Sequence, residues 1–474
     1  MRNFRHLLLL IPLLLLPISL WAQAPVSAGK VSQPADWDKD LALNIPKDLN
    51  PDPHILEINL EAVVKEMEII PGKKTQVWTY NGYLPGPLIK LNVGDRLIVH
   101  FRNSLPEATT IHWHGLRIPN NMDGVPDMTQ PMIQPGGEFT YDFVMPDAGT
   151  FWYHPHVNSA AQVGYGLYGA IVVEDPKAPK IPGDELVLVF SDMSLDENGV
   201  MQAPSSGGRF GDLFGREGPV ILVNGKVMPT LQMRKGKQQR WRVINASRTR
   251  YFTLRYKRSP LVIVGSDGGM AEHTHTVDEI KLVPAERYDF VFTPPDEPGA
   301  DGKFRWYPTN RGYGSTYNRL AEDIMNMHTI NEPAVTPEPV PEQLRKIAPL
   351  DLKDAKERTL NLTIGYDKDE NVAMGINGVH YKDATPYMIK VGQTEVWTIR
   401  NDTDFNHPFH LHGFFFEVLD TNLPMQWKDT VDVPQHSVVR IAMKFDDRPG
   451  MWMFHCHILD HAEVGMMGHL HLER

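Results

Sequence analysis

Short apolar stretches recur along the chain, and turn-forming residues separate them. Arg96–Phe101, Leu186–Phe190 and Leu360–Ile364 each have the length and composition of a β-strand. The 37 Gly and 39 Pro residues supply the breaks between such stretches, and we find no long segment with a helical period of apolar positions. The pattern predicts an all-β protein built from Greek-key β-sandwiches.

One block of sequence occurs three times and sets the expected number of domains. Each copy opens with an Asn-Gly pair, followed by a glycine that precedes an asparagine by nine positions. The copies are Asn81-Gly82 with Gly94 and Asn103, Asn224-Gly225 with Gly236 and Asn245, and Asn377-Gly378 with Gly392 and Asn401. This repeat predicts three consecutive β-sandwich domains of common ancestry. We expect them at residues 55–178, 179–332 and 351–474, with a Pro-rich linker at 333–350.

The first 24 residues have the pattern of a secretory signal peptide. Arg2 and Arg5 precede the apolar run Leu7–Leu16, and Ala22-Gln23-Ala24 is a small-residue cleavage site. Without a paired arginine, a Sec-type signal is expected, which places the protein in the periplasm or outside the cell. Residues 25–54 form a polar, Pro-rich arm, and no segment after the signal is apolar enough to span a membrane.

The chain has a formal net charge of −11, and signal cleavage makes it more negative, because that segment carries two arginines and no acid. This charge argues against nucleic acid as a partner and favours cationic or neutral substrates, although it equally serves solubility. The single cysteine excludes an intramolecular disulfide and indicates a free thiol with a function.

That cysteine, Cys456, lies between His455 and His457, close to His461 and Met466. A thiolate, two imidazoles and a weak thioether are the ligands of a blue-copper electron-transfer site. On a strand, Cys456 points to one face and its two neighbouring histidines to the other, so one strand can connect two metal sites. The alternative is a buried cysteine beside core histidines.

Histidines gather in three further clusters, and their spacing distinguishes two kinds of site. Four His-x-His pairs on predicted strands supply eight imidazoles that can converge between the first and third domains, which suits several copper ions better than one zinc. Strand parity places His407 on the opposite face, where it forms a trigonal site with Cys456 and His461 and with Met466 as axial ligand. The four pairs are His112 and His114, His154 and His156, His410 and His412, and His455 and His457.

With all four motifs complete, the sequence from about residue 55 to the C-terminus resembles the three-domain multicopper oxidases, which include laccases, ascorbate oxidase and copper-efflux oxidases. The resemblance implies three cupredoxin-like domains, four copper ions, and a type 1 copper that passes electrons from a donor to a trinuclear cluster that reduces O2 to water. It also implies a monomer. By resemblance, type 2 copper is held by His112 and His410, one type 3 copper by His114, His154 and His457, and the other by His156, His412 and His455.

Two acids match positions that the family uses. Asp123 resembles an acid near the type 2 copper that orients ligands and supplies protons, although it is also a plausible turn residue before Gly124. Glu463 matches a relay acid of fungal laccase-like sequences, whereas many bacterial relatives carry Glu at the position of Ala462. Asp429 is interpreted as structural, and Arg287 with Asp289 as a structural ion pair.

The substrate depends on loops around His407 and His461, and two classes stay open. Copper-efflux oxidases resemble this chain but carry an Asp and a Met before the type 1 histidine and a long Met-rich insertion. Here Asp402–Asn406 contains no Met, so we expect phenols and similar aromatic donors. Cuprous ion is the alternative, through Met325 and Met327 in an expected loop, because cuprous ion prefers thioether ligands.

Two other classes of protein fit less well. A copper-free structural relative would have lost ligands, and this chain has lost none of them. A copper nitrite reductase has two domains and needs partner subunits, which the complete set of histidines on one chain argues against.

Overall fold

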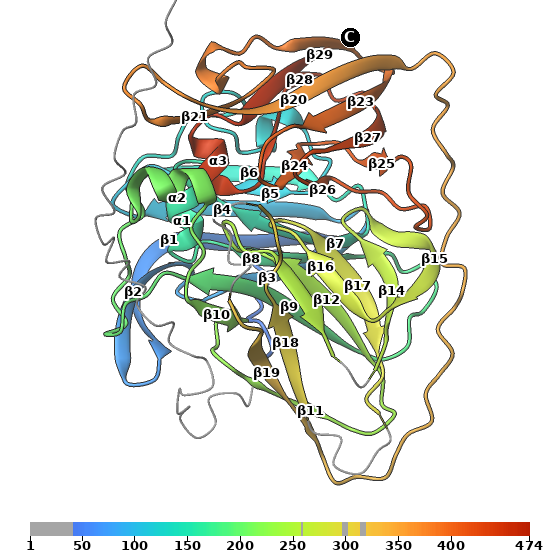
Figure 1. The fold of residues 1–474 in the computed structure, drawn as a ribbon. Coiled ribbons are helices and arrows are strands. Elements are labelled where there is room, and N and C mark those ends of the chain that lie inside the picture. The colour runs from blue at the N-terminus through green and yellow to red at the C-terminus, as the bar shows by residue number, and fades with distance from the viewer. Residues whose placement is uncertain (1–40, 257–258, 296–301, 313–318) are drawn as a thin grey trace, which may run out of the picture.

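The computed structural model describes residues 41–256, 259–295, 302–312 and 319–474, so the expected signal peptide and residues 25–40 of the expected arm lie outside the described residues. The chain forms three two-sheet β-sandwiches in sequence order. Figure 1 shows the third at the top in orange and red, the first across the middle in blue and cyan, and the second below in green and yellow. The all-β prediction is confirmed. Within the described ranges, no helix is long and apolar enough to cross a membrane.

The first sandwich packs the sheet β2-β1-β4-β6 against the sheet β3-β8-β7-β5. Its buried face comes from alternate apolar residues such as Leu97, Val99 and Phe101 on β4. The elements are β1 (Ile55–Ile70), β2 (Lys73–Tyr80), β3 (Gly86–Asn92), β4 (Arg96–Ser104), β5 (His112–His114), the 3₁₀ helix η2 (Asn120–Met122), β6 (Glu138–Val144), β7 (Gly149–His154), α1 (Ser159–Gly164) and β8 (Gly169–Glu174).

The second sandwich has a six-stranded sheet, β10-β9-β12-β17-β14-β15, and a five-stranded sheet, β11-β19-β18-β13-β16. Its core is centred on Trp241 and Trp306, which are fully buried. The elements are β9 (Asp184–Met193), α2 (Gly208–Phe214), β10 (Val220–Val223), β11 (Thr230–Met233), β12 (Gln239–Asn245), β13 (Phe252–Arg255), β14 (Leu261–Ser266), β15 (Gly269–Val277), β16 (Glu279–Leu282), β17 (Arg287–Phe292), β18 (Gly302–Tyr307) and β19 (Glu322–Thr329).

The third sandwich consists of the sheets β21-β20-β23-β27-β25 and β22-β29-β28-β24-β26, and Cys456 lies in its core. Residues 333–350 connect it to the second sandwich without a named strand. The elements are β20 (Lys356–Tyr366), β21 (Val372–Ile376), the 3₁₀ helix η4 (Tyr381–Asp383), β22 (Tyr387–Lys390), β23 (Thr394–Asn401), β24 (His407–Leu411), β25 (Phe416–Val418), β26 (Thr430–Val433), β27 (Ser437–Lys444), β28 (Gly450–Cys456), α3 (Leu459–Glu463) and β29 (Met467–Glu473).

The sequence repeat corresponds to one repeated structural unit. Each Asn-Gly pair has positive φ at both residues, as a two-residue hairpin turn requires. Each repeat asparagine is buried, and its side-chain amide donates to two or three backbone carbonyls across a loop. The three asparagines are Asn103, Asn245 and Asn401. The three sandwiches therefore share the same buried polar contact as well as the same turn.

The expected loop around Met325 and Met327 is wrong, because both residues lie on β19 in the core of the second sandwich. Their exposed fractions are 0% and 1%. A bulge relative to β18 interrupts the strand alternation, so Ile324 and Met325 both point inward. Neither sulfur atom is therefore available at the surface for an incoming ion.

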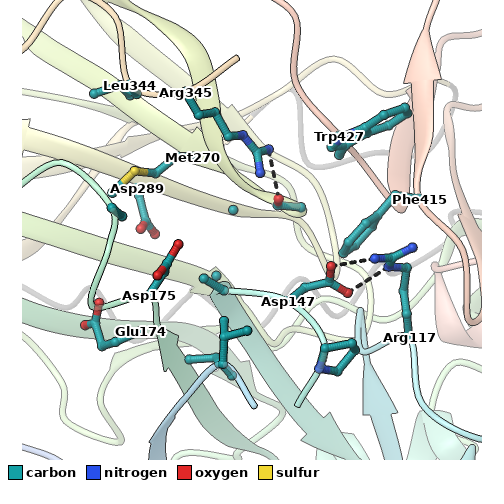
Figure 2. Close-up of a pocket in the computed structure, with 18 of the residues that line it drawn as sticks. Arg117, Asp147, Glu174, Asp175, Met270, Asp289, Leu344, Arg345, Phe415 and Trp427 are labelled. Atoms are coloured by element: carbon teal, nitrogen blue, oxygen red, sulfur yellow. Dashed lines mark hydrogen bonds and ion pairs between the residues drawn. The ribbon is translucent and has the colours of Figure 1, made fainter. Parts of the chain in front are cut away.

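A cavity of about 610 Å³ lies where the three sandwiches meet (Figure 2). Arg117 and Asp147 from the first sandwich form an ion pair on one side, and Phe415 and Trp427 from the third lie beside them. Among the described residues, none of the clustered histidines lines this cavity. The cavity therefore belongs to the junction between the sandwiches rather than to the metal-ligand clusters.

Candidate metal centres

Short antiparallel strands place histidines from the first and third sandwiches in one buried region. β5 pairs with β7, which puts His112 opposite His154, and β24 pairs with β28, which puts His410 opposite His455. The rings of His112 and His412 stack across the two sandwiches with centroids 3.9 Å apart. Histidines of the His-x-His pairs from the first and third sandwiches therefore lie together.

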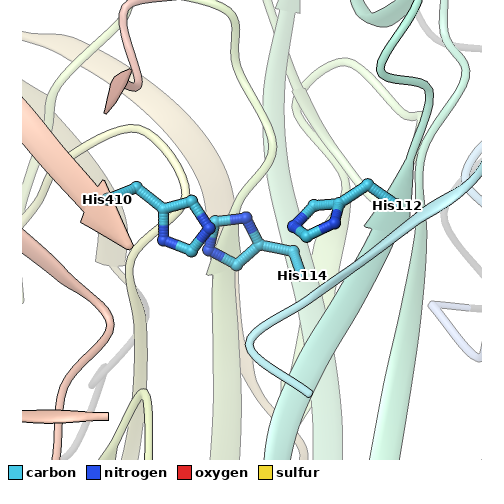
Figure 3. A group of neighbouring side chains, drawn as sticks. All are labelled: His112, His114 and His410. Carbon is cyan, nitrogen blue, oxygen red and sulfur yellow. The ribbon is translucent and has the colours of Figure 1, made fainter. Parts of the chain in front are cut away.

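Three groups of three histidines have ligand nitrogens within 4.8 Å of one another. Figure 3 shows the first of them, in which the rings of His114 and His410 stack at 3.8 Å. All of these histidines are buried except His156, which is half-buried. The groups are His112, His114 and His410; His114, His154 and His457; and His156, His412 and His455.

Hydrogen bonds fix which nitrogen of each ring remains available. In five rings Nδ1 donates to a carbonyl or carboxylate oxygen, which leaves the lone pair of Nε2 directed into the group. His114 is reversed: its Nε2 contacts the Asp429 carboxylate at 3.2 Å, and Nδ1 has no partner among the described residues. The five contacts are those of His112 with the Asp123 carbonyl, His154 with the Pro155 carbonyl, His410 with the Asp429 carbonyl, His455 with the Cys456 carbonyl and His412 with the Asp123 carboxylate.

Burial lowers the pKa of five of these imidazoles in particular, because a charged ring is poorly solvated in the interior. For His156 the pKa falls to about 3, and for His114, His154, His455 and His457 it lies well below the usual value. Neutral imidazoles are the form that binds a metal ion.

A second site lies on the other face of β28. The Sγ atom of Cys456 is 3.5 Å from Nδ1 of His407 and 3.7 Å from Nδ1 of His461, and the two nitrogens are 3.1 Å apart. Met466 is fully buried in the same core cluster, and its carbonyl accepts from the Cys456 amide. The structure therefore brings together the cysteine sulfur and the two imidazoles that parity predicted.

Both histidines of this site are fully buried and held from outside. The Nε2 atom of His461 donates to the Leu213 carbonyl on α2, at 3.1 Å, and Nε2 of His407 lies 2.9 Å from the Thr403 hydroxyl. This contact with α2 could not be predicted from the sequence, because α2 belongs to another domain.

Asp123 follows η2 and bridges two histidines of different sandwiches. Its carboxylate lies 2.8 Å from Nδ1 of His412 and 3.4 Å from Nδ1 of His112. Burial raises the pKa of this carboxyl, but the two imidazoles outweigh burial and hold the pKa well below its usual range. Asp123 is therefore a buried acid that contacts histidines of two different groups.

Glu463 lies at the edge of a cavity of about 220 Å³ that also borders His156 and His455. Its Oε1 atom accepts hydrogen bonds from the backbone amide of Ser159, at 2.6 Å, and from its hydroxyl, at 3.0 Å. Glu463 is exposed, so its carboxylate lies between the solvent and this cavity, which borders two histidines of one group.

The donor set fits copper. Buried imidazole nitrogens without partners in the described structure are costly unless something binds them, and they include Nε2 of His112, His154 and His410 and both nitrogens of His457. The Nε2 atoms of His412 and His455 face each other at 3.1 Å, so one ion could bind both lone pairs. Neutral imidazoles with one thiolate suit copper among the common metals.

Comparison with known proteins agrees with this chemistry. Three family models described as multicopper oxidase match residues 62–178, 185–332 and 351–473. A multicopper oxidase of Staphylococcus aureus is 31% identical, over 87% of each chain, and a laccase of Bacillus subtilis is 28% identical, over 83% of this chain and 89% of the relative.

Among solved structures, a multicopper oxidase from Campylobacter jejuni described as a metallo-oxidase has a TM-score of 0.81 and 31% identity. The match covers 91% of this chain and 94% of the C. jejuni chain. The chain belongs to the multicopper oxidase family. It is a copper-dependent oxidoreductase that uses O2 and an electron donor, and the predicted cupredoxin-like fold is confirmed.

Proposed function

We propose that this protein is a laccase-like enzyme that couples one-electron oxidation of phenolic or other aromatic donors to the four-electron reduction of O2 to water. The observation that carries the proposal is the position of Cys456. It belongs to the group with His407 and His461, and its backbone neighbours His455 and His457 belong to two different histidine groups. The chain therefore offers a short covalent route from an electron-accepting site to an O2-reducing site.

Four copper ions would occupy the four ligand sets. His407, Cys456 and His461 would hold type 1 copper with Met466 as axial ligand, and His112 and His410 would hold type 2 copper. The type 3 pair would be held by His114, His154 and His457 and by His156, His412 and His455. Bound there, copper supplies the one-electron redox chemistry that amino-acid side chains lack.

Two acids would handle protons for O2 reduction. The Asp123 carboxylate lies 2.8 Å from Nδ1 of His412, where it can orient that ring and take part in proton transfer within the buried region. The Glu463 carboxylate lies between solvent and the cavity that borders His156 and His455, where it can take up protons from outside. Each of the two acids has a separate role in this proposal.

Aromatic donors are favoured by the surface over the type 1 ligands. Beside α2, whose Leu213 carbonyl holds His461, lies a groove of about 460 Å³. Phe210 and Tyr366 border it with exposed fractions of 59% and 63%. Aromatic side chains stack on aromatic donors, and none of the described residues that line the groove carries sulfur.

Cuprous ion is the second candidate donor, because the C. jejuni relative is described as a metallo-oxidase. The thioether site first expected for it at Met325 and Met327 is buried in the second sandwich. A cuprous activity would therefore need other ligands near α2, such as Glu370 in the groove.

The remaining parts of the proposal concern the whole chain. We propose domains at 55–178, 179–332 and 351–474, a linker at 333–350, and an N-terminal arm at 25–54, consistent with three separate family matches. Residues 1–24 would direct export by the Sec route, to the periplasm or outside the cell. A monomer would suffice, because one chain supplies every proposed ligand.

The test compares steady-state rates with a dimethoxyphenol and with stabilised cuprous ion. Phe210→Ala and Tyr366→Ala should raise KM for the phenol at least about fivefold, since each removes a stacking surface worth about 1 kcal/mol. Tyr83→Ala removes another exposed aromatic ring, from the first sandwich, and should leave KM unchanged. A much higher kcat/KM for cuprous ion, with no effect of the groove variants on phenol, would assign the enzyme to the metallo-oxidases.

A further inference from the structure

Arg287 is a fully buried arginine of the second sandwich, which supplies none of the proposed ligands. Its guanidinium makes a bidentate ion pair with Asp429 of the third sandwich, at 2.7 Å and 2.6 Å. The pairing with Asp289 that the sequence suggested is wrong: Asp289 pairs with Arg240 and Arg242. The same guanidinium donates to the Thr150 carbonyl of the first sandwich, so it contacts all three sandwiches.

Asp429 connects this arginine to two of the clustered histidines. One carboxylate oxygen lies 3.2 Å from Nε2 of His114, and the Asp429 carbonyl accepts from Nδ1 of His410 at 2.9 Å. The Thr430 hydroxyl donates to the same carboxylate oxygen at 2.9 Å. Asp429 therefore fixes one ring through its side chain and another through its backbone.

The position of Asp429 is itself fixed by the second sandwich. The Asp267 carboxylate accepts from the backbone amide of Arg287 and contacts the ammonium of Lys428 at 3.1 Å. Lys428 also pairs with Glu286 at 2.7 Å, so two acids of the second sandwich hold the residue that precedes Asp429. All of these side chains are buried, and a buried ion pair of this kind is maintained only with close geometry.

Gly115, the residue after His114, leaves room for the pair. It has φ of +87°, and a Cβ atom there would lie 2.4 Å from a guanidinium nitrogen of Arg287 and 2.8 Å from the Asp429 carboxylate. The chain therefore turns sharply after His114, at a residue without a side chain, where the ion pair reaches the ring.

We propose that Arg287 and Asp429 act as a positioning pair through which the ligand-free second sandwich sets the orientation of His114. By holding Nε2, the carboxylate leaves Nδ1, which has no partner in the described structure, to bind in the group with His154 and His457. A misplaced ring would remove one ligand from the group to which His154 and His457 belong. Because a bidentate carboxylate partner requires a planar fork, lysine cannot replace Arg287 in this role.

The test uses a matched pair of conservative variants of the full copper-loaded chain. Arg287→Lys removes the fork beside His114, and Arg242→Lys removes an equally buried fork that pairs with Asp289, Glu185 and Glu174 instead. Copper per chain, the near-ultraviolet absorption of the type 3 pair, the type 2 electron paramagnetic resonance signal and the visible type 1 band are measured for each.

Arg287→Lys should lose at least half of the type 3 absorption per chain and keep the type 1 band, whereas Arg242→Lys should keep both. Asp429→Ala should behave as Arg287→Lys does, and Asp429→Asn should restore much of the signal, because its amide oxygen can accept from His114. The proposal would be overturned if Arg287→Lys kept the type 3 absorption as Arg242→Lys does. It would also be overturned if both variants lost that absorption to the same extent.

This inference rests on the ligand set proposed above, and the two can fail separately. If the unmodified protein lacks type 3 absorption, the proposed function fails. If the unmodified protein has that absorption and Arg287→Lys retains it, only the positioning role fails.

Discussion

The carboxylate of Asp123 lies 2.8 Å from Nδ1 of His412, although 289 residues separate them in the chain. The contact joins the first sandwich to the third at the point where the histidine groups meet. Both side chains are buried, with exposed fractions of 1% and 0%. An acid in this position affects both the orientation of His412 and the supply of protons.

Asp123→Asn should separate these two effects, because the amide keeps the size and an oxygen acceptor but cannot carry a proton. Reoxidation of the reduced enzyme by O2 should slow by about 100-fold, a typical loss for a general acid or base. Reduction of the type 1 site by the donor should stay unchanged in stopped-flow measurements.

Asp127→Asn is the matched control for this change. Asp127 lies on the same loop, is exposed, and has a positive φ that asparagine tolerates. Unimpaired reoxidation in Asp123→Asn, or equal slowing in both variants, would show that Asp123 only shapes the turn.

Glu463→Gln should slow the same reoxidation step by a smaller factor, about tenfold, because solvent can partly replace an exposed proton carrier. Glutamine keeps an oxygen that can accept from the Ser159 amide, so the contact with α1 and the thermal unfolding midpoint should change little. Ser159→Ala tests the contact alone and should leave reoxidation unchanged. A Glu463→Gln variant with normal reoxidation would remove Glu463 from the proton path.

Met466→Leu should raise the potential of the type 1 site, because the axial ligand tunes that potential and leucine cannot coordinate. Leucine fills a similar volume in the buried core, so folding should be preserved. Met467→Leu changes the adjacent, half-buried methionine and should have no effect on the redox titration. The opposite pattern would identify Met467 as the axial residue.

The histidine groups could be predicted from the sequence because strand alternation is a local property. It gave the relation of His455 to Cys456 and of His410 to His412 without any knowledge of the fold. The Arg287–Asp429 contact could not be predicted, because it joins residues 142 positions apart and leaves no local pattern. The same holds for the Leu213 carbonyl that covers His461, which is 248 positions away.

The mistaken loop around Met325 has a specific physical cause. Asp323 and Asn326 resemble turn residues, yet here they lie on β19. The bulge opposite Phe304 and Arg305 breaks the alternation that would have revealed the strand. Tertiary packing of the second sandwich therefore outweighed the local preferences of these two residues.

Acid stability should depend on Glu185, which pairs with Lys90 of the first sandwich and with Arg242 of its own sandwich, each at 2.7 Å. Burial raises the pKa of Glu185, but Arg242 and Lys90 outweigh it and lower the pKa to about 2. The folded pKa lies below the unfolded value, so the stabilisation is present above about pH 4.5 and is lost as the pH falls towards about 2.

Glu185→Gln should therefore reduce the interaction free energy at pH 7 by about 1–2 kcal/mol, after allowance for solvent screening of a side chain that is 24% exposed. Thermal midpoints of the variant and the unmodified protein should differ at pH 7 and converge near pH 2. Glu138→Gln removes an exposed ion-pair partner and should show no such difference. A constant difference at both pH values would contradict the account.

The most direct test of the central claim is the absorption spectrum of the copper-loaded protein, with copper counted per chain, for the unmodified protein and for Cys456→Ser. The unmodified protein should contain four copper ions per chain and show both the visible type 1 band and the near-ultraviolet type 3 absorption. Cys456→Ser should fold, retain three copper ions and the type 3 absorption, and lose the visible band and the oxidase activity. A Cys456→Ser variant that stays blue, or an unmodified protein that binds copper without the visible band, would contradict the account.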